Sequence, residues 1–139
     1  MRQIELIRPI YTFQIDYAQH VSNIVYIQWM EIARLKLLEE AGLPVHVIQQ
    51  HGFVPVLTRT EISYKKALLL GDTVRVVLRI SELKRISATL KFQFFNQKDE
   101  LVADGLQVAL FISLEDQRPY RLPQEERSRF EPYVEGKSP

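Results

Sequence analysis

The sequence predicts an α+β domain in which an antiparallel sheet of about five strands wraps around one long central helix. Three observations predict it: a helical segment that is apolar nearly all round, β-rich segments separated by short polar breaks, and the order strand, helix, four strands. The chain has 139 residues, which suits one domain with a single core. We assign residues 1–122 to this domain and residues 123–139 to a C-terminal tail.

The first strand is expected from Ile4 to Ile15, because apolar residues occupy both of its alternating faces, as in a strand that is covered on both sides. Pro9 indicates that part of this strand lies at an edge or an irregularity, since proline cannot donate to a sheet ladder. The long helix is expected from about Asn23 to Ala41. Ser22 or Asn23 would cap its start with a short polar side chain, and Gly42 would end it.

A short helix or turn over residues 43–53 leads into the remaining strands. Period-two alternation predicts four of them, at Val54 to Lys66, Thr73 to Leu83, Ser87 to Asn96 and Leu101 to Leu114. The tail is rich in charge and proline, so we expect an extended exit with one helical turn over Gln124 to Phe130 and a frayed end. A β-rich domain of this kind has sheet edges that favour dimerisation.

The composition narrows the classes of function. Lys and Arg number 18 against 17 Asp and Glu, and 46% of residues are apolar, so a nucleic-acid partner is not indicated. The chain has no cysteine, which excludes disulfides, thiol nucleophiles and cysteine-ligated metal. His20, His46 and His51 do not form a recognised ligand spacing, so no metal and no cofactor are expected. No segment is typical of a signal peptide or a membrane span, so we expect a soluble, cytoplasmic protein without membrane insertion.

Three motifs carry a family resemblance. They are DYAQHVSNIVY at Asp16 to Tyr26 with EIAR at Glu31 to Arg34, ISYKKALLLGDTVRV at Ile62 to Val76, and SLEDQRPYRLP at residues 113–123. Together they resemble the hot-dog-fold thioesterases of the 4-hydroxybenzoyl-CoA thioesterase type, over about Ile10 to Pro123. The pattern is most similar to the branch that includes plant acyl-lipid thioesterases and their bacterial relatives, which release fatty or β-keto fatty acids from acyl carrier protein. Gln19 stands where this family usually has glycine, and Ser22 where it has a first asparagine.

The resemblance implies an enzyme that hydrolyses acyl-CoA or acyl carrier protein thioesters to a free carboxylic acid, with a fatty acid as the expected product. Such hydrolysis needs a base or nucleophile beside the carbonyl and donors for the oxygen that becomes negative. The resemblance assigns these roles to Asp16 and to the backbone amide near Asn23 at the positive end of the helix dipole, with His20 in support. The alternative for Asp16 is a loop acid that accepts nearby N–H bonds, and for His20 a structural hydrogen bond in the loop.

Further residues are candidates for substrate binding. They are Tyr26, Glu31, Thr58, Thr60, Lys65, Lys66 and Arg85. Glu31 is the rival to Asp16, because some hot-dog enzymes take their carboxylate from the central helix; its alternative is an ion pair with Arg34. The basic residues suit the phosphates of coenzyme A or the acidic surface of acyl carrier protein, and the alternative is a solvated strand face.

Thr58 and Thr60 are candidates for contacts across a subunit interface, with plain β-propensity as the alternative. Tyr64 is grouped with the aromatic residues that mostly form the core, a few of which are candidates to line an acyl tunnel. We expect a homodimer or homotetramer. The rival function is a non-catalytic hot-dog protein that binds acyl-CoA or another ligand, suggested by Gln19. A third function, hydration or dehydration of an acyl thioester, is less favoured, because hot-dog enzymes of that kind usually have a differently placed catalytic histidine.

Overall fold

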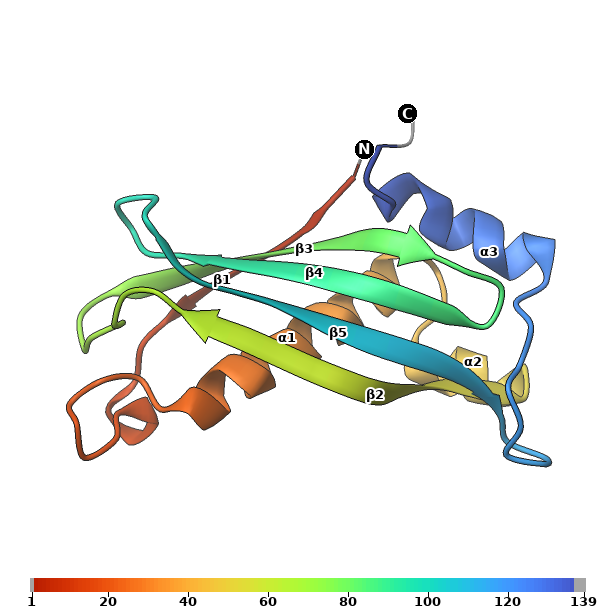
Figure 1. Cartoon of the computed structure of the whole chain (residues 1–139), viewed down its shortest axis with the longest axis horizontal. Coiled ribbons are helices and arrows are strands. Elements are labelled where there is room, and N and C mark those ends of the chain that lie inside the picture. The colour runs from red at the N-terminus through yellow and green to blue at the C-terminus, as the bar shows by residue number, and fades with distance from the viewer. Residues whose placement is uncertain (1, 137–139) are drawn as a thin grey trace.

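A computed structural model describes residues 2–136 and places five strands in one antiparallel sheet. The sheet order is β1-β3-β4-β5-β2, and the sheet curves around helix α1 (Figure 1). The elements are β1 (Ile4–Pro9), α1 (Asn23–Glu40), α2 (Val45–Gln50), β2 (Phe53–Tyr64), β3 (Thr73–Leu83), β4 (Ser87–Phe95), β5 (Leu101–Ser113) and α3 (Gln124–Phe130), with 3-10 turns at Thr12–Gln14 and Glu131–Tyr133. The predicted α+β architecture is confirmed, and the bounds of the last four strands agree to within two residues.

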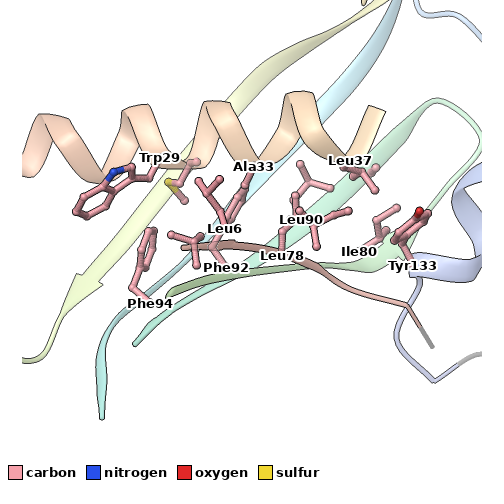
Figure 2. Close-up of a cluster of buried hydrophobic side chains, with 14 of the residues drawn as sticks. Leu6, Trp29, Ala33, Leu37, Leu78, Ile80, Leu90, Phe92, Phe94 and Tyr133 are labelled. Atoms are coloured by element: carbon pink, nitrogen blue, oxygen red, sulfur yellow. The ribbon is translucent and has the colours of Figure 1, made fainter. Parts of the chain in front are cut away.

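The core lies between α1 and the concave face of the sheet. The buried residues of α1 are Val25, Tyr26, Trp29, Met30, Ala33 and Leu37. Figure 2 shows several of them pointing at side chains of β3 and β4, including Leu78, Phe92 and Phe94. Full burial of such a side chain contributes about 1.5–3 kcal/mol relative to leaving it exposed.

Gly105 on β5 lets the helix come close to the sheet. A Cβ atom there would lie 2.5 Å from the Glu61 carbonyl oxygen and 3.1 Å from the Met30 Cε atom. A larger residue would clash first with the backbone of the neighbouring strand β2 and would also displace the end of the Met30 side chain, so this glycine serves the close packing of both against β5.

The start of α1 differs in detail from the prediction. Ser22 holds the N-cap position with an extended backbone, but its side chain makes no capping hydrogen bond, so the predicted side-chain cap is wrong. The Ser22 N–H donates instead to the Gln14 carbonyl oxygen at 2.9 Å, which ties the loop before the helix to the turn at Thr12–Gln14. The helix ends one residue before the expected Ala41, and Gly42 follows in the left-handed region with φ of 79°.

The expected first strand is too long. Strand β1 ends at Pro9, whose register partner is Thr73, and a 3-10 turn begins at Thr12. Because Pro9 has no N–H, the ladder to β3 cannot continue through it in the usual pattern. The Tyr11 N–H instead donates to the Gln14 Oε1 atom at 2.8 Å, which closes the turn.

The C-terminal segment folds back onto the sheet. The predicted helix is confirmed as α3, and Phe130 and Tyr133 are buried in the core, with Tyr133 beside Ile80 in Figure 2. The Glu135 N–H donates to the Ile80 carbonyl oxygen at 2.8 Å. Residues 131–136 therefore pack against the sheet, and the frayed end expected at residues 137–139 lies outside the described residues. No helix within residues 2–136 is long and apolar enough to cross a membrane.

Candidate active site

A pocket of about 260 Å³ lies beside the N-terminus of α1. We call it the helix-start pocket. Three segments build it: the loop after β1, the first turn of α1, and the end of β2 with the loop that follows. Its lining residues are Asp16, His20, Val21, Asn23, Tyr26, Tyr64, Lys65, Lys66, Ala67 and Leu68. Six of the residues proposed from the sequence thus lie around one pocket, although about 40 residues separate its two halves in the chain.

The loop before α1 closes around the Asp16 carboxylate. The Asp16 Oδ1 atom accepts hydrogen bonds from the N–H groups of Ala18, at 2.9 Å, and His20, at 3.4 Å. The other oxygen, Oδ2, has no hydrogen-bond partner within residues 2–136. Asp16 is therefore a loop acid on one oxygen, as the structural alternative required, and keeps a carboxylate oxygen free on the other.

Gln19 and His20 shape this loop through their backbones. The backbone of Gln19 lies in the left-handed region with φ of 66°, a conformation that costs free energy for a residue with a Cβ atom. The His20 carbonyl oxygen accepts from the Asp16 N–H at 2.8 Å, and the exposed imidazole makes no hydrogen bond to any residue in the described part of the chain. The backbone of His20, not its ring, orients Asp16.

The first amides of α1 are free. Helix geometry leaves the first four N–H groups without partners inside the helix, and a capping side chain normally takes one or two of them. Here the Val25 N–H donates to the Ser22 carbonyl oxygen at 3.0 Å, but the N–H groups of Asn23 and Ile24 meet no acceptor among residues 2–136. Two unpaired donors at the positive end of an 18-residue helix form a site for a negative oxygen.

Two tyrosines form the inner wall of the helix-start pocket. Tyr26 is only 2% exposed, and its ring lies edge-on to the ring of Tyr64 at a centroid distance of 5.1 Å. Burial, with a smaller contribution from Tyr64, raises the pKa of Tyr26 to about 12. Burial raises the pKa of Tyr64 as well. Both hydroxyl groups therefore remain protonated donors at physiological pH.

Tyr64 was grouped from the sequence with aromatic residues that are mostly core, a few of which were candidates to line an acyl tunnel, and the structure places Tyr64 outside the core. Its side chain is 46% exposed, and it lines the pocket. Tyr64 is the last residue of β2, where the sheet stops covering its neighbours. Alternation along a strand predicts which face of the sheet a residue lies on, but it does not predict whether other elements pack over that face at the end of the strand.

The two lysines at the rim have acidic partners. The Lys66 Nζ atom lies 2.7 Å from Glu100 Oε2, and the Lys65 Nζ atom lies 3.8 Å from Asp104 Oδ2. Hydrogen bonds, first from Lys66 and then from Asn96, lower the pKa of Glu100. The positive charge at this rim is thus partly neutralised within the protein.

A second cavity, of about 240 Å³, lies between the C-terminal half of α1 and the sheet. We call it the apolar cavity. Its lining residues are Glu31, Arg34, Leu35, Leu37, Leu38, Val45, Val54, Pro55, Leu57, Ile80, Leu83, Ala88, Leu90, Ala109, Phe111 and Phe130. Glu31 therefore borders a pocket, as its rival role proposed, but a different one from Asp16.

Arg34 is the half-buried charge of the apolar cavity. Its Nη1 atom donates to Gln107 Oε1 at 2.6 Å, and Gln107 is completely buried. Gln107 in turn donates through Nε2 to the Thr60 Oγ1 atom at 3.3 Å. Burial lowers the pKa of Arg34, against a smaller opposite effect of Glu31, whose carboxylate is 3.9 Å away and largely exposed. The predicted Glu31–Arg34 pair exists, but the partner that holds Arg34 is Gln107.

The other proposed residues lie elsewhere. The Thr58 hydroxyl donates to the Val108 carbonyl oxygen at 3.3 Å, beside an irregularity in the pairing of β2 with β5. Arg85 lines a basic groove with Lys84, Arg121 and Arg127.

Gln107 was not singled out from the sequence, although the sequence could have indicated it. Gln107 is the one hydrogen-bonding side chain among the inward-facing positions of β5, which are Ala103, Gly105, Gln107, Ala109 and Phe111.

The comparison with known proteins agrees with this geometry. A model of the thioesterase-like superfamily matches residues 12–130. The chain belongs to this superfamily. It is an acyl thioester hydrolase with the hot-dog fold that the motifs predicted.

Several thioesterases are similar to it. The long-chain acyl-CoA thioesterase FadM of Escherichia coli is 26% identical over 123 residues, which cover 88% of this chain and 92% of FadM. A Thermus thermophilus thioesterase whose structure was solved with coenzyme A and Zn is 29% identical, with a TM-score of 0.80 over 98% of this chain and 96% of that one. A DHNA-CoA thioesterase from Staphylococcus aureus shares the fold, with a TM-score of 0.84 at 22% identity over 95% of this chain and 93% of that chain.

Proposed function

We propose that this thioesterase hydrolyses acyl-CoA thioesters to a free fatty acid in the helix-start pocket. The observation that carries the proposal is the meeting, in one pocket, of Asp16, which has a free carboxylate oxygen, with Asn23, whose unpaired amide begins α1. Coenzyme A is favoured over acyl carrier protein because the similar proteins FadM and the Thermus thioesterase are named for acyl-CoA or were solved with coenzyme A. A cytoplasmic location and a role in fatty acid metabolism belong to the same proposal.

The reaction follows from these groups. The thioester carbonyl oxygen lies against the N–H groups of Asn23 and Ile24, which stabilise the negative charge of the tetrahedral intermediate. Asp16 takes a proton from the attacking water, or attacks the carbonyl carbon itself to form a mixed anhydride that water then hydrolyses. The C–S bond breaks, and the thiolate leaves as the free thiol after protonation. A donor of this oxyanion-binding type typically contributes about 10²–10³ in rate.

The acyl chain requires an apolar site, and the apolar cavity provides one. Along α1, however, the lining residue nearest to Asn23 is Glu31, roughly 12 Å away at 1.5 Å per residue, so the cavity does not adjoin the helix-start pocket of the same chain. An antiparallel second copy would set the helix-start pocket of one protomer beside the apolar cavity of the other.

We therefore propose a homodimer formed through β2 and the outer face of α1. Strand β2 is 12 residues long and has one unpaired edge. The outer face of α1 carries Ile24, Ile27 and Leu35, which are 66%, 47% and 45% exposed. Exposed apolar side chains of this density, beside an open edge strand, favour a protein interface. Two such dimers can pair into a tetramer.

Sedimentation of the wild type and of Ile27→Lys tests the dimer contact. The variant should shift toward monomer, and a variant that sediments like the wild type would contradict the proposed contact.

The decisive experiment measures thiol release from acyl-CoA and acyl carrier protein substrates over a range of chain lengths. Asp16→Asn should lower kcat by roughly 10²–10⁴ on every substrate, since its loss removes the base or nucleophile. Asp116→Asn is the matched control, because Asp116 also accepts a hydrogen bond from the amide two residues on, that of Arg118 at 3.0 Å, but does not line the helix-start pocket. If Asp16→Asn turns over as fast as Asp116→Asn, the catalytic role of Asp16 is contradicted. If the carrier-protein substrates are hydrolysed faster than the acyl-CoA substrates, the substrate is acyl carrier protein and not coenzyme A.

A further inference from the structure

We infer that the hydroxyl group of Tyr26 is a third oxyanion donor, a catalytic residue that hydrogen-bonds the thioester carbonyl oxygen together with the amides at the start of α1. This inference rests on the proposed function of the helix-start pocket. It gives a catalytic role to a residue that the sequence named only as a candidate for substrate binding.

The Tyr26 hydroxyl is a buried polar group without a protein partner. The residue is 2% exposed, and its hydroxyl forms no hydrogen bond within residues 2–136. In the same range, no fully buried side-chain nitrogen or oxygen atom lacks a partner. The small exposed part of Tyr26 must therefore include the hydroxyl, and the surface that Tyr26 offers is that of the helix-start pocket. The hydroxyl therefore faces the pocket with its donor free, and a substrate oxygen that binds there can accept its hydrogen bond.

The position of Tyr26 on the helix aims it at the oxyanion site. Tyr26 follows Asn23 by three residues, so the two lie on neighbouring positions of the same helix face. Long side chains on a helix lean toward its N-terminus and cover the preceding turn. A Tyr26 side chain with this lean points toward the first turn of α1, and Tyr26 lines the same pocket as Asn23.

The ring is held in place before substrate arrives. It packs edge-on against Trp29, Tyr64 and Phe94, with centroid distances of 5.3, 5.1 and 5.3 Å. Trp29 and Phe94 belong to the buried core, as Figure 2 shows for both. A donor fixed by core packing costs no reorganisation when negative charge develops beside it, which is the property that makes oxyanion donors effective.

The other groups of the pocket do not duplicate this role. Lys65 and Lys66 are paired with acids, and the Asp16 carboxylate can only accept. Tyr64 has a similar hydroxyl but is 46% exposed, so water competes for it. The raised pKa of Tyr26, about 12, keeps it protonated throughout the working range. Tyr26 therefore keeps its proton in the reaction: Asp16 accepts the proton from water, and the sulfur leaves with the electron pair of the C–S bond.

The test is Tyr26→Phe, which removes the hydroxyl and preserves the ring contacts. The matched control is Tyr133→Phe, because Tyr133 is also 2% exposed but does not line the helix-start pocket. We expect kcat of Tyr26→Phe to fall about tenfold or more on every acyl-CoA length, with KM nearly unchanged, because the lost bond strengthens only in the transition state. Tyr133→Phe should remain close to wild type. Wild-type kcat in Tyr26→Phe would overturn the inference, as would a change in KM alone or a loss confined to some acyl groups.

A structure of the wild-type protein provides a check that does not depend on a variant. In a complex with an acyl-CoA analogue whose thioester sulfur is replaced by methylene, the ketone oxygen should lie about 2.7–3.1 Å from the Tyr26 hydroxyl oxygen. A ketone oxygen more than about 3.5 Å away would overturn the inference. The proposed function fails separately, if the wild type shows no hydrolysis or Asp16→Asn shows full activity.

Discussion

The helix-start pocket and the apolar cavity, both beside α1, differ in whether their polar groups have hydrogen-bond partners. Around the helix-start pocket, an Asp16 oxygen, the Asn23 amide and the Tyr26 hydroxyl have no partner within residues 2–136. In the apolar cavity, the charge of Arg34 is held by Gln107, which is held in turn by Thr60. The difference teaches that unpaired polar groups mark the place for chemistry, whereas a paired polar chain inside an apolar wall mainly sustains the fold.

The helix itself explains part of this difference. Its first turn has free N–H groups because of its geometry, while the amides of its middle turns are bonded to carbonyl oxygens four residues earlier. The C-terminal half of α1 can therefore offer a ligand only side chains, and here these are mostly Leu. The reacting carbonyl suits one end and the hydrocarbon chain suits the other.

The comparison is tested most strongly by breaking the polar chain of the apolar cavity. Gln107→Leu leaves the Arg34 guanidinium without its acceptor, and we expect unfolding free energy to fall by about 1–3 kcal/mol. The double variant Arg34→Met with Gln107→Leu should recover most of that loss, because it removes the unpaired charge as well. Urea unfolding measures both, and a single variant as stable as wild type would show that Gln107 does not support Arg34.

Filling the apolar cavity should separate chain binding from chemistry. Ala88 lines the cavity with a small side chain, so Ala88→Leu should lower kcat/KM for long acyl chains by about tenfold, a cost of about 1.4 kcal/mol in transition-state binding. Short acyl chains that do not reach the cavity serve as the internal control. Equal losses at every chain length, with unchanged thermal unfolding, would contradict the assignment of the chain to this cavity.

The loop of the helix-start pocket provides a smaller effect. Gln19→Gly relieves a left-handed backbone, and we expect a gain of at most about 1 kcal/mol after the extra flexibility of glycine in the unfolded chain is subtracted. Gln117→Gly is the matched control, because Gln117 has φ of 62° and does not line the pocket. Similar stability gains with a change of kcat only in Gln19→Gly would show that Gln19 tunes the active loop. Destabilisation of both variants would contradict the assigned strain.

The last effect is absent at neutral pH and concerns alkaline stability. The folded pKa of Tyr26, about 12, exceeds the unfolded value near 10, so between these values the unfolded chain releases a proton that the folded protein keeps. Unfolding free energy should therefore fall as pH rises from about 10 to 12, with no effect at neutral pH. Denaturant titrations over this range should show a shallower fall for Tyr26→Phe than for wild type. Parallel curves would mean that Tyr26 is not desolvated in the folded state.

Local patterns in the sequence predicted most of the fold. The 3.6-residue and two-residue periods located α1 and the four later strands, because each period reports the face that one element buries. Gly42 marked the helix end through its positive φ. The proximity of Asp16 to Asn23 was also available from the sequence, since a loop of a few residues joins them whatever the rest of the chain does.

Only the tertiary structure decided which distant segments complete each hollow. Pairing of β2 with β5 brought Gln107 opposite Thr60, and curvature of the sheet brought Tyr64 to Tyr26. Register and curvature depend on contacts between segments far apart in the chain, which a local period does not encode. The motifs alone were enough to place a carboxylate beside a helix start and to name Tyr26 as a candidate. The packing of the sheet around that helix buried the Tyr26 ring and left it lining the same pocket as Asp16.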